Sequence, residues 1–186
     1  MEWPSGGESP AIRHTAAFLA DIAELVLSGY RRYPWGGAEV GGVLFGTRDS
    51  AGVCMYAVGA VECEHDHGPA FELSPKDFAG LERLLSAAPD GELKGLVPVG
   101  WNHSVSNREL ALTDHDRRLH ERFFPEPWQV SMILRRSKSG PLAIGFFQRN
   151  SAGSLEAHSL RREFAVEDFR LSATDVPLAD LQLTVP

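Results

Sequence analysis

The sequence has little cysteine, no excess of basic charge and no long apolar run. Its two cysteines, Cys54 and Cys63, fit neither a zinc knuckle nor a disulfide framework, which favours a reducing compartment. Eighteen Lys and Arg residues stand against 25 Asp and Glu residues, so the basic footprint of a nucleic-acid or anionic-membrane protein is missing. No uncharged stretch approaches the roughly 18 residues that span a bilayer, and no signal-peptide pattern opens the chain. We therefore expect a cytoplasmic protein that binds neither nucleic acid nor membrane.

What is present is the composition of an ordinary globular protein, with 43% hydrophobic and 23% charged residues in a chain of 186. This length predicts one domain, over residues 15–165, with an N-terminal extension at 1–14 and an acidic C-terminal tail at 166–186 that docks on the domain or on a partner. The compositional feature that invites chemistry is histidine, because it serves at neutral pH as a metal ligand or as an acid or base. The seven histidines are at positions 14, 65, 67, 103, 115, 120 and 158.

The hydrophobic periodicity predicts a mixture of helices and strands. Helices are expected over 15–30, from Ser74 to about residue 89, and from Thr113 to about residue 124. The second begins with an N-cap and capping pattern, and the third should turn His115, Leu119 and Phe123 inward. Strands are expected at 40–46, 52–62, 96–103, 128–135, 142–149 and 154–160, the first two as a hairpin. Because helices and strands do not alternate strictly, we expect an α+β fold with a mixed sheet flanked by helices.

Three polar features separated in the sequence are placed where one site could assemble. Glu39 stands just before the strand at 40–46, His103 ends the strand after Trp101, and Thr113-x-x-Asp116 begins the third helix. Their contexts are Ala-Glu-Val-Gly-Gly-Val-Leu-Phe-Gly at 38–46 and Val-Gly-Trp-Asn-His-Ser at 99–104. With these contexts the chain, over roughly residues 15–165, resembles the MPN domain (JAB and Mov34 family) of the JAMM metalloisopeptidases.

The resemblance implies an MPN/cytidine-deaminase-like sheet and a zinc site of known composition. In the family, two histidines of a His-x-His-Pro segment and an aspartate hold the ion. Residues i and i+2 of a strand point to the same side, so two imidazoles there can reach one zinc ion. On this resemblance His103 and Asp116 are metal ligands, Glu39 is the base that takes the proton of the zinc-bound water, and Thr113 hydrogen-bonds the oxyanion.

The sequence departs from the family pattern at the second ligand. It reads His103-Ser104-Val105-Ser106, so Val105 stands at the second histidine and Ser106 at the proline. Valine has no lone pair, which leaves His103 and Asp116 as an incomplete site. We therefore expect a pseudoenzyme without a cofactor, a binding or scaffolding module whose partner is a protein. The resemblance implies a homodimer, or a heteromer with another MPN subunit.

The alternative is a working zinc-dependent metallopeptidase or isopeptidase acting on a ubiquitin-like or sulfur-carrier-like protein. The missing ligand would then come from elsewhere, for example from His65 or His67 in the polar segment Glu-His-Asp-His.

Simpler interpretations stand beside the site. Thr113-x-x-Asp116 is also an ordinary capping box, and Glu39 alone is typical of a solvated residue ahead of a buried strand. His103 alone is typical of a hydrogen-bonded, partly buried histidine. His65 and His67 also fit a solvated loop, and His115 should point about 100° away from Asp116, its neighbour on the helix.

Overall fold

Three α-helices and nine strands are present in the part of the chain that the computed structural model describes. That part comprises residues 2–3, 11–32, 37–66, 68–87, 90–106, 108–136, 142–157 and 162–164. The helices are α1 (Ala16–Arg31), α2 (Pro75–Ser86) and α3 (Asp114–Phe123), with a short 3-10 helix, η1 (Gly91–Leu93). The strands are β1 (Glu2–Trp3), β2 (Ala11–His14), β3 (Gly41–Asp49), β4 (Gly52–Val61), β5 (Val97–Val105), β6 (Val130–Arg136), β7 (Leu142–Arg149), β8 (Leu155–Ala157) and β9 (Arg162–Phe164).

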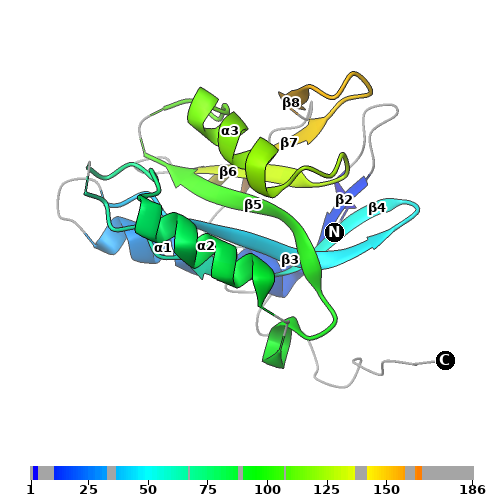
Figure 1. Cartoon of the computed structure of the whole chain (residues 1–186), viewed down its shortest axis with the longest axis horizontal. Helices are drawn as coiled ribbons and strands as arrows, with labels where there is room; N and C mark the ends of the chain where they lie inside the picture. Colours follow the sequence, from blue (N-terminus) through cyan, green and yellow to red (C-terminus); the bar gives the residue numbers. More distant parts are fainter. Residues whose placement is uncertain are drawn as a thin grey trace.

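All nine strands belong to one mixed sheet. Its order is β1-β2-β4-β3-β5-β6-β7-β8, with β9 also paired to β7. The pairs β2–β4 and β5–β6 are parallel and the other pairs are antiparallel. The expected α+β fold with a mixed sheet flanked by helices is confirmed, as is the expected hairpin of β3 and β4 (Figure 1).

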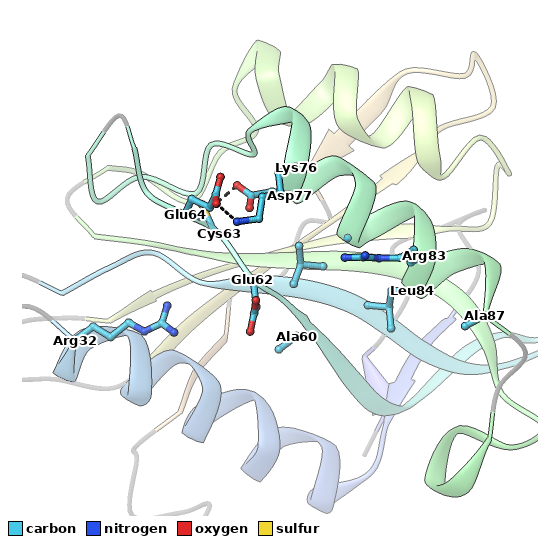
Figure 2. A pocket seen from close by; sticks show the side chains of 12 residues that line it. Arg32, Ala60, Glu62, Cys63, Glu64, Lys76, Asp77, Arg83, Leu84 and Ala87 are labelled. Carbon is cyan, nitrogen blue, oxygen red and sulfur yellow. Dashed lines mark hydrogen bonds and ion pairs between the residues drawn. The ribbon is translucent and has the colours of Figure 1, made fainter.

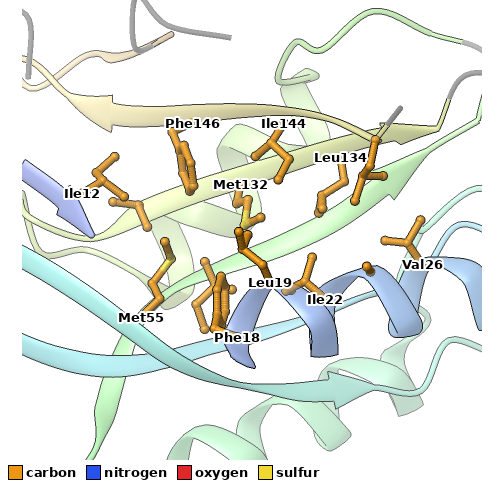
Figure 3. Packing of buried hydrophobic residues seen from close by; sticks show 14 of the residues in the cluster. Ile12, Phe18, Leu19, Ile22, Val26, Met55, Met132, Leu134, Ile144 and Phe146 are labelled. Carbon is orange, nitrogen blue, oxygen red and sulfur yellow. The ribbon is translucent and has the colours of Figure 1, made fainter. Parts of the chain in front are cut away.

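The helices cover both faces of the sheet. Helix α1 packs on one face through Phe18 and Ile22, and α2 and α3 pack on the other through Leu81 and Leu119. Successive strand residues point to opposite faces, so each central strand contributes to both cores. In β6, for example, Met132 and Leu134 belong to the α1 core, whereas the residue between them belongs to the other. Figure 3 shows the α1 core, in which α1 packs along the strands.

Capping residues begin the helices where the sequence predicts. The Thr15 hydroxyl accepts a hydrogen bond from the Phe18 N–H and begins α1. Ser74 and Asp77 form a reciprocal capping box at α2, and the proline at the first helical position needs no N–H partner. Such a cap contributes about 1 kcal/mol to stability. No described helix is both long and apolar enough to cross a bilayer.

The sheet begins earlier in the chain than the sequence indicates. Strand β2 lies within residues 1–14, expected to be an extension outside the domain, yet it pairs in parallel with β4. Strand β9 is an addition at the other end of the chain, where no strand was expected. The expected tail at 166–186 lies outside the described residues, as do residues 158–160 of the expected last strand.

Candidate functional site

The sheet brings Glu39 and His103 to the same end of two neighbouring strands. Strands β3 and β5 are antiparallel, and Gly41 at the start of β3 pairs with His103 near the end of β5. Glu39 precedes β3 by two residues, and Asp116 lies in the first turn of α3, whose N-terminus reaches the same place. The three candidate residues therefore converge as the sequence predicts, and all three side chains are buried.

His103 is fixed on both faces and at one edge. Its ring stacks on Trp101 with a centroid separation of 5.3 Å and on Phe71 with one of 5.7 Å. Its Nδ1 lies 2.9 Å from the Ser104 carbonyl oxygen, to which it donates a hydrogen bond. The remaining nitrogen, Nε2, lies 3.3 Å from Oδ1 of Asp116 without a well-directed hydrogen bond. Metal-binding histidines are held in the same way, with one ring nitrogen on a carbonyl and the other directed into the site.

Asp116 has two roles at once. Its Oδ2 accepts a hydrogen bond from the Thr113 N–H at 2.8 Å, and its own N–H donates to the Thr113 hydroxyl at 3.2 Å. This reciprocal pair is the capping box considered from the sequence. Burial alone would raise the pKa of Asp116, but the His103 ring and the bonds with Thr113 outweigh it and lower the pKa to about 2. The carboxylate is therefore charged at neutral pH.

Glu39 is not a solvated residue; it ties three segments together. Its Oε1 accepts a hydrogen bond from the Ser106 N–H at 2.9 Å, and its Oε2 accepts one from the Phe71 N–H at 3.1 Å. Arg108 adds a longer contact of 3.4 Å from Nη2 to Oε2. Both carboxylate oxygens therefore already hold backbone donors, which gives Glu39 a structural function whether or not it acts as a base.

Arg108 is the site residue that the sequence analysis missed. Its Nη1 lies 3.9 Å from Oδ2 of Asp116, so the guanidinium contacts both carboxylates of the site. It comes from the loop between β5 and α3, and its side chain is 36% exposed. Nothing in the family pattern marks position 108. Only the conformation of the loop between β5 and α3 shows that Arg108 lies at the site.

Val105, which the resemblance places at the second zinc ligand, is packed as a core residue. It has no exposed surface and belongs to the apolar cluster beneath α2 and α3, with Leu110 and Leu119. A zinc site needs three protein donors plus water, and Val105 provides none. No group of three or more His, Cys, Asp or Glu residues among those described could hold a metal ion. The described residues therefore do not fit zinc, despite the ligand-like orientation of His103.

The described contacts of His65, one of the proposed substitute ligands, lie within its own loop. Nδ1 of His65 lies 3.2 Å from the Ala70 carbonyl oxygen within its own loop. His67 lies outside the described residues. His115 is half-buried and no described contact joins it to Asp116, in agreement with the expected 100° offset between neighbours on a helix.

The inward face of α3 differs from the expected one. Asp116, Leu119 and His120 are its buried residues, whereas His115 and Phe123 are half-buried, so the prediction was correct only for Leu119. Nδ1 of His120 accepts a hydrogen bond from the Trp101 indole N–H at 3.1 Å and lies 2.7 Å from the Ser131 hydroxyl oxygen. His120 therefore supports Trp101, which in turn stacks on His103.

A separate groove of about 660 Å³ lies beside the open edge of β4. Strand β2 pairs only with the first four residues of β4, and no described strand pairs with the same edge over residues 56–61. Figure 2 shows α2 along one side of the groove and Glu62 at the end of β4 within it, with Arg32 reaching in from the end of α1. The ion pair of Lys76 with Glu64 lies at its margin. None of the candidate site residues lines it.

Comparisons with known proteins bear on the fold alone. The chain matches no family model and no curated protein. It is similar to the solution structure of a protein from Desulfitobacterium hafniense, with a TM-score of 0.51 and 17% identity over 78% of this chain and 89% of that one. A solution structure from Salinibacter ruber has a TM-score of 0.45 and 19% identity over 82% and 90% of the two chains.

Proposed function

We propose that this chain is an MPN-like domain that works without a metal, as a binding or scaffolding module for a protein partner. The observation that carries the proposal is Val105, which has no exposed surface and stands where the resemblance expects the second zinc ligand. Glu39 supports it, because the residue that should activate water instead holds the Ser106 and Phe71 backbone. On this proposal the chain keeps an MPN-like arrangement of Glu39, His103 and Asp116 but lacks the third donor.

The groove beside β4 supports a binding function. Its volume lies in the usual range of about 300–1,000 Å³ for binding pockets, and an unpaired strand edge can accept an extended peptide as a further strand. The neighbouring residues Arg32, Glu62 and Arg83 are exposed, so charged groups of both signs are available at its rim. These features are typical of a contact surface for a protein segment.

A second candidate function is zinc-dependent hydrolysis of a peptide or isopeptide bond. One observation favours it: Nδ1 of His103 is tied to a carbonyl and Nε2 faces Asp116, the orientation of a metal ligand. The third donor would have to come from outside the described residues, for example from His67 or from a partner. Substrates would be ubiquitin-like or sulfur-carrier-like proteins.

Elemental analysis of the purified full-length chain separates the two functions. The binding module should contain less than about a tenth of a zinc ion per chain after dialysis against micromolar zinc, and added zinc should not raise its melting temperature. One zinc ion per chain, together with chelator-sensitive hydrolysis of a ubiquitin-like fusion that is lost in Glu39→Gln, would establish the second function instead. Circular dichroism of the variant controls for loss of folding.

A further inference from the structure

Two carboxylates and one guanidinium meet in the candidate site. Glu39 and Asp116 come from different elements, are 6% and 2% exposed, and would together place two negative charges in a buried region. Buried charges are tolerated when they are paired. Among the described residues Arg108 is the cation that contacts both, with Nη2 3.4 Å from Oε2 of Glu39 and Nη1 3.9 Å from Oδ2 of Asp116.

The loop that carries Arg108 is anchored on the same two carboxylates. At its start the Ser106 N–H donates to Oε1 of Glu39, and at its end the Thr113 N–H donates to Oδ2 of Asp116. Between these anchors Leu110 and Leu112 are buried in the cluster beneath α2 and α3. The backbone anchors therefore bring the residues around Arg108 to the site, where its guanidinium contacts both carboxylates.

We propose that Arg108 is the built-in cation of this site, supplying the positive charge that zinc supplies in JAMM enzymes and keeping divalent metals out. This inference deepens the proposed function and rests on it. A guanidinium is protonated at every physiological pH, so it neutralises the carboxylates without any metal. Its planar fork of five N–H donors can also bridge two carboxylates, which a point charge such as Lys does less well.

The inference implies two independent obstacles to metal binding. One is the missing donor at Val105, and the other is the positive charge of Arg108 beside Asp116. Restoring a histidine at position 105 removes only the first obstacle, because an incoming dication would still meet the guanidinium. Both changes together should be needed for a site that binds metal.

Metal binding is measured on the full chain and on Val105→His, Arg108→Gln and the double variant. The probes are Zn²⁺ in equilibrium dialysis and Co²⁺ by its visible absorption, which reports tetrahedral coordination. The double variant should bind about one ion per chain, at least about tenfold more tightly than Val105→His. Equal affinity of Val105→His and the double variant would overturn the inference, and zinc in the unmodified chain would instead overturn the proposed function.

A charge experiment decides the question even if the buried Val105→His variants do not fold. Arg108→Gln is compared with Arg118→Gln, an exposed arginine on α3, in the original chain and in a Glu39→Gln background. Arg108→Gln should lower the folding equilibrium constant about tenfold more than the control, because it leaves both carboxylates without their cation. In the Glu39→Gln background, the loss caused by Arg108→Gln should exceed that caused by Arg118→Gln by less than about threefold. If Arg108→Gln exceeds its control equally in both backgrounds, or in neither, the assigned role is contradicted.

Discussion

The buried histidine of α3 should make the stability of the protein depend on pH between 7.5 and 5. His120 has no exposed surface, and its Nδ1 accepts the indole N–H of Trp101. Burial, with a smaller contribution from the charge of Arg149, lowers the pKa of His120 from 6.5 to about 3. Protonation would place a second N–H opposite the indole donor, so the neutral ring is the one that fits.

Because the pKa of His120 is lowered by folding, the protein should become less stable as the pH falls. The unfolded chain binds a proton near pH 6.5 and the folded chain only near pH 3, so the unfolded state gains protons first. The stabilisation is therefore fully present above pH 6.5 and is lost progressively as the pH falls toward 3. With these pKa values the free energy of unfolding should decrease by about 2 kcal/mol between pH 7.5 and 5.0 because of His120.

Urea unfolding of the full chain and of His120→Gln at both pH values measures this change. Gln keeps an acceptor for the Trp101 N–H but does not titrate. The variant should therefore be less stable than the original chain at pH 7.5, and much of this difference in the free energy of unfolding should disappear at pH 5.0. All other titratable groups are the same in the two proteins, so their contributions cancel in the comparison. Asp116 does not interfere, because its lowered pKa removes stability only below about pH 3.8. A difference between the two proteins that stays constant within about 0.5 kcal/mol would refute the reasoning.

Three further substitutions have expected effects on chemical unfolding at pH 7.5. Glu39→Ala should cost about 2–4 kcal/mol, because two backbone donors lose their acceptor, and a loss below about 1 kcal/mol would show that water replaces the carboxylate. Gly80→Ala should stabilise the chain by about 0.5–1 kcal/mol, because a Cβ there meets only Arg83 at 3.9 Å within α2; destabilisation would reveal a contact with residues beyond those described. Ser74→Ala should cost about 1 kcal/mol by removing the cap of α2, whereas no change would mean that Asp77 alone begins the helix.

Local signals were sufficient for the elements whose structure depends on neighbouring residues. Thr15 and Ser74 mark the starts of α1 and α2 because capping is decided within one helical turn. The strand at 142–149 was also placed at its observed bounds, because a continuous apolar run between turn residues indicates a buried strand.

Features that depend on distant pairing were not visible in the sequence. Strand β2 has four residues, and what makes it a strand is its parallel partner β4, about 40 residues later in the chain. The inward face of α3 was misjudged for a related reason. His120 is polar, and only the indole of Trp101 and the hydroxyl of Ser131 make its burial acceptable. Arg108 was missed for the same reason, because its position at the site depends on the path of the loop between β5 and α3.

The capping box at Thr113-x-x-Asp116 uses only one side-chain oxygen of Asp116, because a carboxylate has two. Oδ2 accepts the Thr113 N–H and completes the capping box, while Oδ1 faces Nε2 of His103. The capping bond fixes the rotamer of Asp116 and thereby directs the other oxygen at the ring. Helix capping thus positions Asp116 against His103, so a sequence pattern that is common for structural reasons can also order a buried polar cluster. On this argument Asp116→Asn, which can still accept the Thr113 N–H, should preserve α3 but weaken the attraction of the site for Arg108.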